Sequence, residues 1–373
     1  MFPRFRKKRK KVVLRSQNSS PDWIFLGTGI FLAIFGLFMI GNVSAAEALR
    51  EFGDKFYFLK LQFIWFLIGG VLFLIFYHLP LKFLKNISFF LLLASLFFLV
   101  IVLIPGIGTE VWGAKRWLFF GPVRFQPAEL AKFSFLLWGA AFLTSQRNKI
   151  PFFIILGLIS GLILLEPDLG TTVALVSSAL VIYFLAGAPL WQMILLVLGG
   201  VLGGLGLIFS SSYRKERFLT FLNLERDPLG FSYHIRQILI AIGSGGIFGL
   251  GLGHSRQKYS FVPAVTTDSI FAIIAEELGF LGSLFLIFIY LFLIWRGLKI
   301  AKYAPDKFTQ ILAGGIIFGL GFQVLINLGS MTALLPLTGI PLPFISYGGS
   351  SLVLNLISLA ILANISRQRK VIK

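Results

Sequence analysis

The sequence predicts an all-α protein that crosses a membrane about ten times, and three observations lead to this prediction. First, 57% of the 373 residues are hydrophobic and only 13% are charged, whereas soluble domains are about 45–50% apolar. Second, the apolar residues form runs long enough to span a bilayer as helices. Third, the basic residues gather in alternate connections between these runs, as the positive-inside rule requires.

The apolar runs are separated by short polar connections that contain glycine, proline or charged residues. An even number of spanning helices returns the chain to its starting side, so we expect both termini in the cytoplasm. Helices are expected at residues 23–43, 58–77, 87–104, 129–144, 151–165, 171–186, 190–209, 268–295, 308–328 and 350–365.

The charge distribution supports this orientation. Eight basic residues lie between Arg4 and Arg15, and others fall in the even-numbered connections and in the C-terminal tail. Of the acidic residues, only Asp22 and Asp306 fall on the same side. The net charge of +19 therefore reflects membrane topology and does not indicate a nucleic-acid partner. We divide the chain into a basic tail (1–20), a transmembrane domain (21–367) and a C-terminal tail (368–373).

Residues 235–252 are apolar enough to form an eleventh spanning helix. An eleventh span would put the basic C-terminal tail outside, and the glycines between Gly243 and Gly251 weaken a helix. We therefore expect a large outer loop over residues 210–267, in which this segment is re-entrant or surface-lying and is buried against protein.

Several function classes are excluded by composition. The chain has no cysteine, so it has no disulfide, thiolate metal site or cysteine nucleophile. Its three histidines are scattered and show no zinc-binding spacing. The glycine-rich segment lacks the strand–helix context and the GK[ST] sequence of a phosphate-binding loop. Without a nucleotide motif, ATP-driven transport is disfavoured.

Residues 263–279 place the carboxylates of Asp268, Glu276 and Glu277 at the outer end of an apolar run. Ionisable groups in a membrane are costly and often functional, although Asp268 could instead cap the helix. A straight helix would put Glu276 about 12 Å along the axis from Asp268. A helical wheel separates two faces of this run. One face is a stripe of small and polar residues: Asp268, Ala272, Ala275, Gly279, Gly282 and Ser283, with Glu276 at its edge. The opposite face, which we expect to face lipid, contains Ile270, Ile273, Ile274, Glu277, Phe280 and Leu281.

Three other outer segments carry polar residues. Residues 108–132 hold Trp117 and Arg116, which fit either an aromatic belt with snorkelling cations or a site. Glu129 and Lys132 are spaced for an ion pair facing the bundle interior. Asp168 follows Pro167 and can cap the next helix, so residues 166–172 form either a structural hairpin or part of a site.

The last outer segment, residues 336–351, contains prolines and glycines that predict a rigid, non-helical backbone. Such a backbone is tolerated at membrane depth only where it lines a cavity or packs in protein. The hydroxyls of Ser346, Tyr347, Ser350 and Ser351 could donate hydrogen bonds to an anionic ligand.

Motifs along the chain together point to one family. They are GAKRW with FQPAELAK (113–132), EPDLGTT (166–172), FLNLERDPLG (221–230), IAIGSGGIFGLGLG (240–253), TDSIFAIIAEELG (267–279) and PFISYGGSS (343–351). Through these motifs the sequence from residue 22 to residue 367 resembles the SEDS family (shape, elongation, division and sporulation), also known as FtsW/RodA. The N-terminal tail and residues 57–65 and 108–117 look more like the division-type FtsW than the elongation-type RodA.

This resemblance implies a peptidoglycan glycosyltransferase that polymerises lipid II on the outer face and releases undecaprenyl pyrophosphate. It identifies Asp268 as the essential aspartate, suited to act as the general base for an acceptor hydroxyl. An α-linked donor and a β product imply a single inverting displacement, for which one carboxylate suffices. The leaving pyrophosphate needs positive charge. Candidates for substrate or pyrophosphate binding are Arg116, Lys132, Trp117, Glu129, Arg214, Arg217 and Ser350, with Glu276, Glu277 and Asp168 in supporting roles.

The resemblance also implies partners and a location. A class B penicillin-binding transpeptidase and other divisome membrane proteins are expected at the septum of a bacterial cytoplasmic membrane, and a divalent cation such as Mg or Mn could share the pyrophosphate work. The family pattern is close to LPE-x-HTDFIF, from which this chain departs at Ala264, Thr266 and Ser269. These departures keep open the alternative of a non-catalytic divisome scaffold. A second alternative is a lipid II flippase, which a polar-lined bundle with midplane carboxylates also fits.

Overall fold

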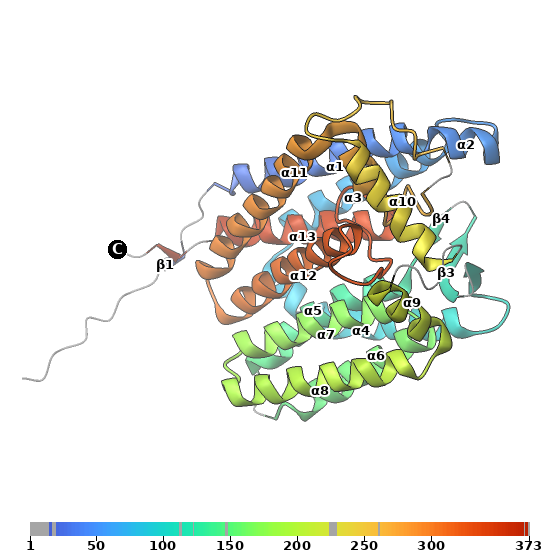
Figure 1. Ribbon diagram of the computed structural model, residues 1–373. Coiled ribbons are helices and arrows are strands. Elements are labelled where there is room, and N and C mark those ends of the chain that lie inside the picture. The colour runs from blue at the N-terminus through green and yellow to red at the C-terminus, as the bar shows by residue number, and fades with distance from the viewer. Residues whose placement is uncertain are drawn as a thin grey trace, which may run out of the picture.

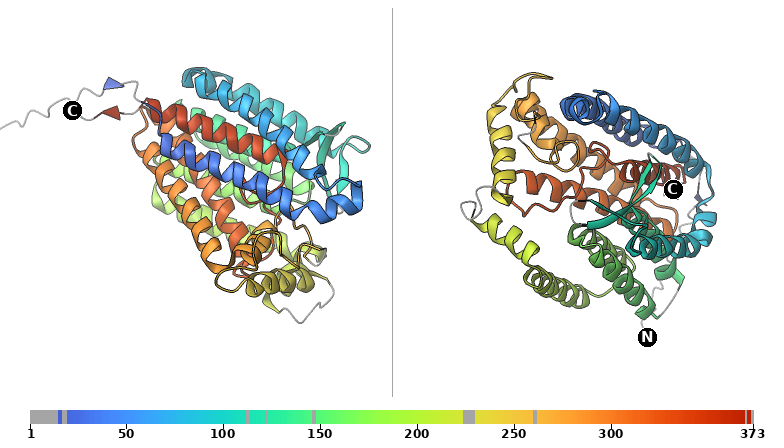
Figure 2. Two further views of the ribbon diagram at one scale, coloured as in Figure 1. Left: turned by 90° about the horizontal axis from the view of Figure 1, so that it is seen from above. Right: turned by 90° about the vertical axis from the view of Figure 1, so that its right-hand side faces the viewer.

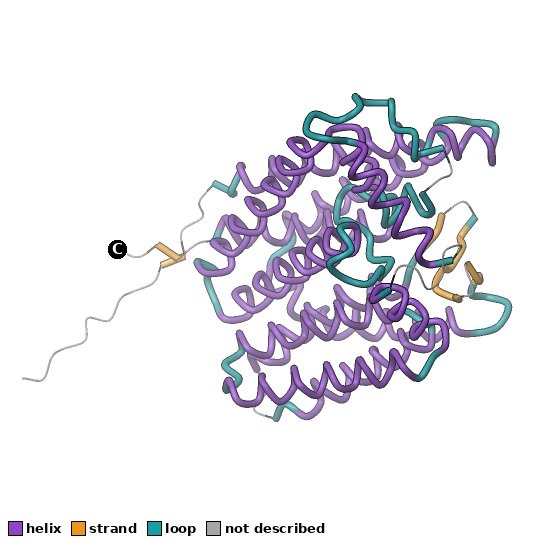
Figure 3. The backbone as a smooth tube through the Cα atoms, viewed as in Figure 1, coloured by secondary structure: helices purple, strands orange, loops and turns teal. Residues whose placement is uncertain are grey.

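The computed structural model describes residues 15–16, 20–111, 114–121, 123–145, 148–223, 230–259, 262–368 and 370–371. These residues form a helical bundle with a small antiparallel sheet at one end (Figures 1 and 3). The helices are α1 (Trp23–Val43), α2 (Ala45–Phe52), α3 (Tyr57–His78), α4 (Leu81–Leu103), α5 (Pro127–Ser145), α6 (Ile150–Leu165), α7 (Leu169–Leu185), α8 (Leu190–Phe209), α9 (Ser212–Leu222), α10 (Phe231–Ser244), α11 (Ile270–Lys302), α12 (Lys307–Met331) and α13 (Gly349–Arg367).

The predicted all-α membrane fold is confirmed, because ten of these helices correspond to the ten predicted runs. Within the described chain, α1, α3, α4, α8, α11, α12 and α13 are long and apolar enough to cross a membrane. Helices α6 and α7 are shorter, with 16 and 17 residues. Helix α5 carries Glu129 and Lys132 in its first turns. Helix α4 begins at Leu81, six residues before the predicted start at residue 87, because Lys82 and Lys85 belong to its first turns rather than to a loop.

Both ends of the described chain lie at the same end of the bundle (Figure 1). There, strand β1 (Arg15–Ser16) pairs antiparallel with β5 (Lys370–Val371). At this end Asp22 caps α1 and forms an ion pair of 2.6 Å with Arg296, which lies near the end of α11. The even number of crossings is therefore confirmed, and the basic residues at this end make it the cytoplasmic one.

The centre of the bundle is formed by α5, α7, α12 and α13. Helix α13 is buried along nearly its whole length, because α1, α3, α5, α11 and α12 pack around it. Close approach requires glycine at Gly36, where an added Cβ would meet the backbone of residues 344–345. Helix α8 has no buried residue and lies at the edge of the bundle, as Figures 1 and 2 show. The central helices are thus the ones that position polar side chains at the outer end.

The large outer loop contains two helices that do not span the membrane, α9 and α10. Helix α10 ends at Ser244, and residues 245–259 and 262–268 form turns and irregular segments. The prediction that residues 235–252 do not form an eleventh crossing is confirmed.

The prediction of one continuous helix over residues 268–295 is wrong. Helix α11 begins at Ile270 and extends to Lys302, but Gly279 has φ 69° and ψ −168° and breaks it. The glycine-rich segment 246–251 pairs with this break. Leu250 and Gly251 donate their backbone N–H groups to the carbonyls of residues 276 and 277, at 3.0 Å each. Phe280 and Leu281 donate to the carbonyls of residues 246 and 247, at 2.9 and 3.1 Å. Backbone groups that the helix leaves unpaired at membrane depth are therefore satisfied.

The predicted lipid-facing side is also wrong for the first part of α11. All residues from Ile270 to Glu277 are buried, because α10, α12 and segment 246–251 cover this half-helix. Glu277 therefore faces protein, not lipid. The small stripe ends at Gly279, where the helix changes direction. A wheel drawn for one straight helix cannot anticipate either result.

The outer end also carries a sheet that the sequence analysis did not predict. Strands β2 (Thr109–Val111), β3 (Ala114–Phe120) and β4 (Val123–Phe125) pair antiparallel in that order. The sheet packs against α4 and α5, and Leu118 is buried beneath it. Figure 3 shows it at the end of the bundle opposite the two tails, which is the outer end.

Candidate active site at the outer end of the bundle

Asp268 lies in the turn that precedes α11 and is 8% exposed. The N-cap of α11 is Ser269, and no side-chain capping bond is made there, so the capping alternative for Asp268 is not what the structure adopts. Its Oδ1 accepts a hydrogen bond of 3.0 Å from Thr267 Oγ1. Asn327 on α12 donates its amide to the backbone carbonyl of Asp268 at 2.8 Å and to that of Ile340 at 2.9 Å. One buried amide thus joins the Asp268 turn to the last outer loop.

The last outer loop faces the other carboxylate oxygen of Asp268. A Cβ placed on Gly339 would lie 3.9 Å from Asp268 Oδ2, and Gly339 has φ +73°. Tyr347 donates its backbone N–H to the Thr266 carbonyl at 2.8 Å. The predicted non-helical backbone is confirmed for residues 336–348, whereas residues 349–351 belong to the first turn of α13. The loop therefore lies directly beside the aspartate and is bonded to the turn that carries it.

Arg116 on β3 holds the turn between α6 and α7. Its Nε donates to the Glu166 carbonyl at 2.9 Å and its Nη2 donates to the Pro167 carbonyl at 2.5 Å. The side chain of Asp168 lies 4.0 Å from Arg116 Nε and caps α7 by accepting from Thr171 N at 2.9 Å. Arg116 remains 32% exposed. The two carbonyls thus fix the orientation of the guanidinium, while part of the Arg116 side chain remains exposed and accessible to a ligand.

The Arg116 turn and the Asp268 turn contact the same outer loop. A Cβ placed on Gly170 would lie 3.0 Å from the Thr338 carbonyl, one residue before Gly339, which faces Asp268. The structure therefore brings Arg116, Asp168 and Asp268 around residues 338–339. Among the described residues, no hydrogen bond or ion pair joins Asp268 directly to Arg116 or Lys132.

Glu129 and Lys132 form the predicted ion pair, with Lys132 Nζ 2.6 Å from Glu129 Oε1 and both side chains nearly buried. They line a cavity of about 60 Å³ between α5, α7, α12 and α13. Gln323 also lines it and lies one helical turn before Asn327 on the same face of α12. The remaining polar lining comes from Ser178, Asn355 and Ser358. A cavity with these polar side chains in a mostly apolar wall thus lies one turn deeper than the amide that anchors the aspartate.

The other predicted binding residues fall in different places. Ser350 is buried, and its hydroxyl accepts from Gln126 N at 3.0 Å, so it joins β4 to α13. Trp117 lies half-buried in β3, and Arg214 lies half-buried on α9. The charge of Arg217, also on α9, acts on His234 of α10. His234 in turn lies 2.9 Å from Ser269, the neighbour of Asp268.

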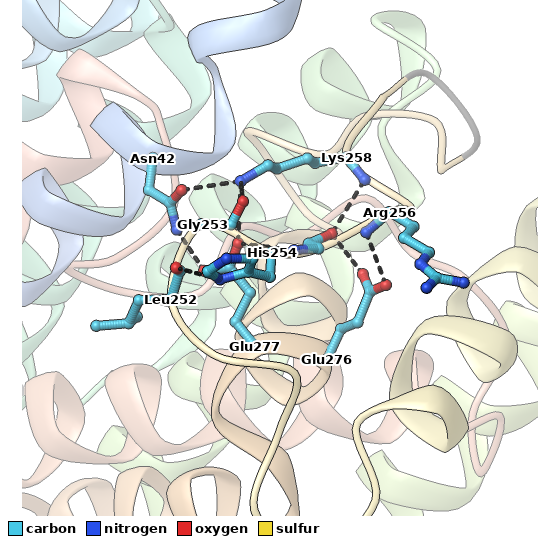
Figure 4. A network of polar contacts seen from close by, with 9 residues as sticks. Asn42, Leu252, Gly253, His254, Arg256, Lys258, Glu276 and Glu277 are labelled. Atoms are coloured by element: carbon cyan, nitrogen blue, oxygen red, sulfur yellow. Dashed lines mark hydrogen bonds and ion pairs between the residues drawn. The ribbon is translucent and has the colours of Figure 1, made fainter.

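Glu276 and Glu277 hold the loop that follows the glycine-rich segment (Figure 4). Lys258 Nζ lies 3.1 Å from Glu277 Oε1 and 3.0 Å from Asn42 Oδ1 on α1. Asn42 also donates its amide to Glu277, and Ser255 donates its hydroxyl to Glu276. These carboxylates are fully engaged by the protein, which fits a supporting role rather than direct substrate contact.

The described residues offer no group of three or more histidine, aspartate or glutamate side chains that could hold a metal ion. The carboxylates nearest the site are bonded to protein groups, as Thr267, Thr171 and Lys132 illustrate. These described carboxylates therefore do not form a cation-binding cage.

Sequence reasoning missed His234, Asn327, Asn42 and Lys258. Each reaches the Asp268 turn or the α11 break from a segment distant in the chain. No local pattern distinguishes them, because a single polar residue in an apolar stretch usually indicates only a buried hydrogen bond.

Comparison with known proteins identifies the family. A family model described as "Cell cycle protein", which groups FtsW, RodA and SpoVE, matches residues 22–371. The chain belongs to this family. Stage V sporulation protein E of Bacillus subtilis is 39% identical over 362 residues, covering 95% of this chain and 99% of that protein. A probable peptidoglycan glycosyltransferase FtsW of Coxiella burnetii is 38% identical over 357 residues, covering 92% and 95%.

Solved structures of the FtsW/RodA/SpoVE family share the fold. One belongs to a peptidoglycan synthase complex described as coordinating polymerization and crosslinking. It has a TM-score of 0.77 and 29% identity, and the match covers 93% of this chain and 98% of that one. The rod shape determining protein RodA of Thermus thermophilus gives a TM-score of 0.69 at 28% identity, covering 94% and 97%. The resemblance drawn from the motifs is therefore confirmed across nearly the whole chain.

Proposed function

We propose that this chain is a peptidoglycan glycosyltransferase that polymerises lipid II on the outer face of the bacterial cytoplasmic membrane. One observation carries the proposal: a nearly buried aspartate, Asp268, lies at the outer end of the bundle. Relatives that match over 95–97% of their length are named probable peptidoglycan glycosyltransferases. The relatives named FtsW support a role in cell division, although a sporulation protein also matches.

Asp268 is the general base in this proposal. The acceptor sugar hydroxyl attacks the anomeric carbon of the donor, and Asp268 takes the hydroxyl proton. The bond from that carbon to the phosphate oxygen breaks in the same step, and the electron pair leaves with undecaprenyl pyrophosphate. Thr267 and Asn327 fix the carboxylate and its backbone. Such preorganisation supports catalysis because the base need not reorient in the transition state.

Arg116 and Lys132 are the proposed partners of the leaving pyrophosphate. Arg116 presents a partly exposed guanidinium whose orientation is fixed by two carbonyls. Lys132 lines the cavity together with Glu129, Gln323 and Asn355. Positive charge at both positions would stabilise the charge that develops on the leaving oxygen. Arg214 and Arg217 on α9 are alternative candidates for binding the pyrophosphate. Trp117 is a candidate for contact with the sugar or the lipid.

A transpeptidase partner is part of the proposal. The solved synthase complex that shares this fold is described as coordinating polymerization with crosslinking. We extend this to a class B penicillin-binding transpeptidase for the present chain, with other divisome proteins at the septum. A divalent cation remains an additional hypothesis that the side chains described above do not support.

Purified protein, with and without its transpeptidase, tests the proposal when it is given fluorescent lipid II in detergent. We expect glycan ladders from the native chain and none from Asp268→Asn. Asp54→Asn is the matched control, because Asp54 is an exposed outer carboxylate paired with Lys60. Labelled lipid II that crosses liposomes without polymer would favour a flippase. No polymer and no crossing, with the transpeptidase bound, would favour a scaffold.

A further inference from the structure

Helix α10 covers the half-helix that follows Asp268, and one of its side chains bonds to the residue next to the aspartate. His234 Nε2 lies 2.9 Å from Ser269 Oγ. We propose that His234 is a positioning residue for Asp268: the neutral imidazole accepts the Ser269 hydroxyl hydrogen, fixes the turn that carries the base, and releases that turn when it becomes protonated. This inference rests on the proposed function, which assigns the base role to Asp268.

We assign Nε2 of His234 as the acceptor in this contact. The backbone of Pro263 acts on the ring and raises the pKa of His234. Because proline has no N–H group, its carbonyl favours a hydrogen on the ring. A neutral imidazole carries its hydrogen on one nitrogen only, and the other nitrogen is an acceptor. With the hydrogen on Nδ1, Nε2 accepts from the hydroxyl of Ser269, a residue that is completely buried.

His234 lies where three segments meet around the aspartate. His234 comes from α10, Pro263 from the end of the outer loop, and Ser269 is the N-cap of α11. Asp268 lies between the last two in sequence. Its backbone carbonyl accepts a second bond, from the side-chain amide of Asn327 on α12. The turn is thus held by both His234 and Asn327.

The charges around the ring oppose one another. Burial lowers the pKa of His234, the negative charge of Asp268 raises it, and the positive charge of Arg217 on α9 lowers it. Helix α10 itself carries Arg236, and the outer half of α12 carries no charged residue. The net direction is a pKa below the ordinary histidine value, so the ring is neutral at pH 7 and above.

Protonation of His234 would change the site in two ways. An imidazolium has donors on both nitrogens and no acceptor, so the Ser269 hydroxyl would lose its acceptor in a buried position. A positive charge beside Asp268 would also weaken the aspartate as a base. Polymerisation should therefore fall on the acid side partly because His234 becomes protonated.

The first test is the pH profile of lipid II polymerisation by the full chain between pH 5 and pH 9. His234→Gln keeps an acceptor oxygen for Ser269 but does not titrate. We expect its rate at pH 8 to stay within about threefold of the native rate, and its acid limb to become shallower and to move to lower pH. His234→Leu and Ser269→Ala should both lose about tenfold or more across the whole range. An unchanged acid limb in His234→Gln, or loss of its activity at every pH while the protein remains folded, would overturn the proposal.

The second test does not depend on activity. The chain has only three histidines, His78, His234 and His254, so ¹⁵N-histidine NMR in nanodiscs can follow His234, assigned by its loss in His234→Gln. We expect it to titrate below the ordinary value and to shift lower still in Asp268→Asn. Titration at or above the ordinary value would refute the positioning role. If the NMR result holds but the native chain makes no polymer, the enzymatic proposal fails and the contact at Ser269 stands.

Discussion

Lys258 and Glu277 form an ion pair of 3.1 Å between the outer loop and the half-helix behind the Asp268 turn. Their side chains are 7% and 0% exposed. Glu277 also accepts from Asn42, so the pair ties α1 to the loop as well. A buried pair contributes little when it is compared with an apolar pair, but removal of one partner leaves an unpaired buried charge.

We therefore predict that Lys258→Met lowers the free energy of unfolding by about 3–5 kcal/mol, and that adding Glu277→Gln restores much of the loss. Tryptophan fluorescence during thermal unfolding in detergent measures both. Lys60→Met is the control, because Lys60 pairs with Asp54 while 66% exposed; its loss should be below about 1 kcal/mol. If Lys258→Met and Lys60→Met lowered the free energy of unfolding equally, Lys258 would not act as a buried ion-pair partner that holds the outer loop.

The break in α11 gives a second prediction, at Gly279. Its φ of 69° with ψ of −168° is a conformation that residues other than glycine rarely adopt. An added Cβ would also collide with the backbone of residues 247–249. Gly279→Ala should therefore destabilise the protein and detach the glycine-rich segment from the break.

Limited proteolysis of the outer loop and thermal unfolding measure this effect. Gly161→Ala in α6 is the matched control, because a Cβ there meets nothing within 4 Å and alanine is preferred over glycine by up to about 1 kcal/mol in a helix. The control should be neutral or stabilising. Normal stability and protease resistance in Gly279→Ala would show that the chain tolerates a continuous helix here.

Glu166, in the turn between α6 and α7, gives a prediction about pH. Both of its carboxylate oxygens are buried without a hydrogen-bond partner. Burial, helped by the charge of Asp168 and opposed by Arg116, raises the pKa of Glu166 from 4.5 to about 9. Between these values the unfolded chain loses the proton while the folded chain keeps it. Stability from this group is thus complete below pH 4.5 and declines as pH rises toward 9, by up to about 1.4 kcal/mol per pH unit.

Glu166→Gln removes this dependence. We expect the variant to be more stable than the native chain at pH 8, with the difference shrinking toward pH 5, as measured by melting temperature in a series of buffers. Asp54→Asn serves as an exposed control and should show no such convergence. A native chain whose melting temperature rises from pH 5 to pH 8, relative to Glu166→Gln, would mean that Glu166 is ionised in the folded protein.

The sequence predicted the ten spanning segments well because hydrophobic length and charge asymmetry are local properties of the chain. It also predicted the ion pair of Glu129 and Lys132, whose spacing places both on one face of a helix. The prediction that Glu277 faces lipid was wrong, because the helix breaks at Gly279 and segment 246–251 covers the half-helix that carries Glu277. The partners of Asp268 were missed for a related reason: Asn327 and His234 reach it only through the tertiary fold.

The last prediction concerns Arg116, whose guanidinium donates to two backbone carbonyls at once. Lysine carries the same charge but lacks the planar fork, so it cannot reproduce both bonds with one fixed orientation. Arg116→Lys should therefore reduce kcat/KM for lipid II polymerisation by about tenfold, equivalent to about 1.4 kcal/mol, while leaving thermal stability nearly unchanged. Lys115→Arg is the control, because neighbouring residues on a strand point to opposite faces and Lys115 is adjacent to Arg116 on β3. If both variants keep full activity, charge and orientation at Arg116 are unimportant for the leaving pyrophosphate, and Lys132 becomes the stronger candidate.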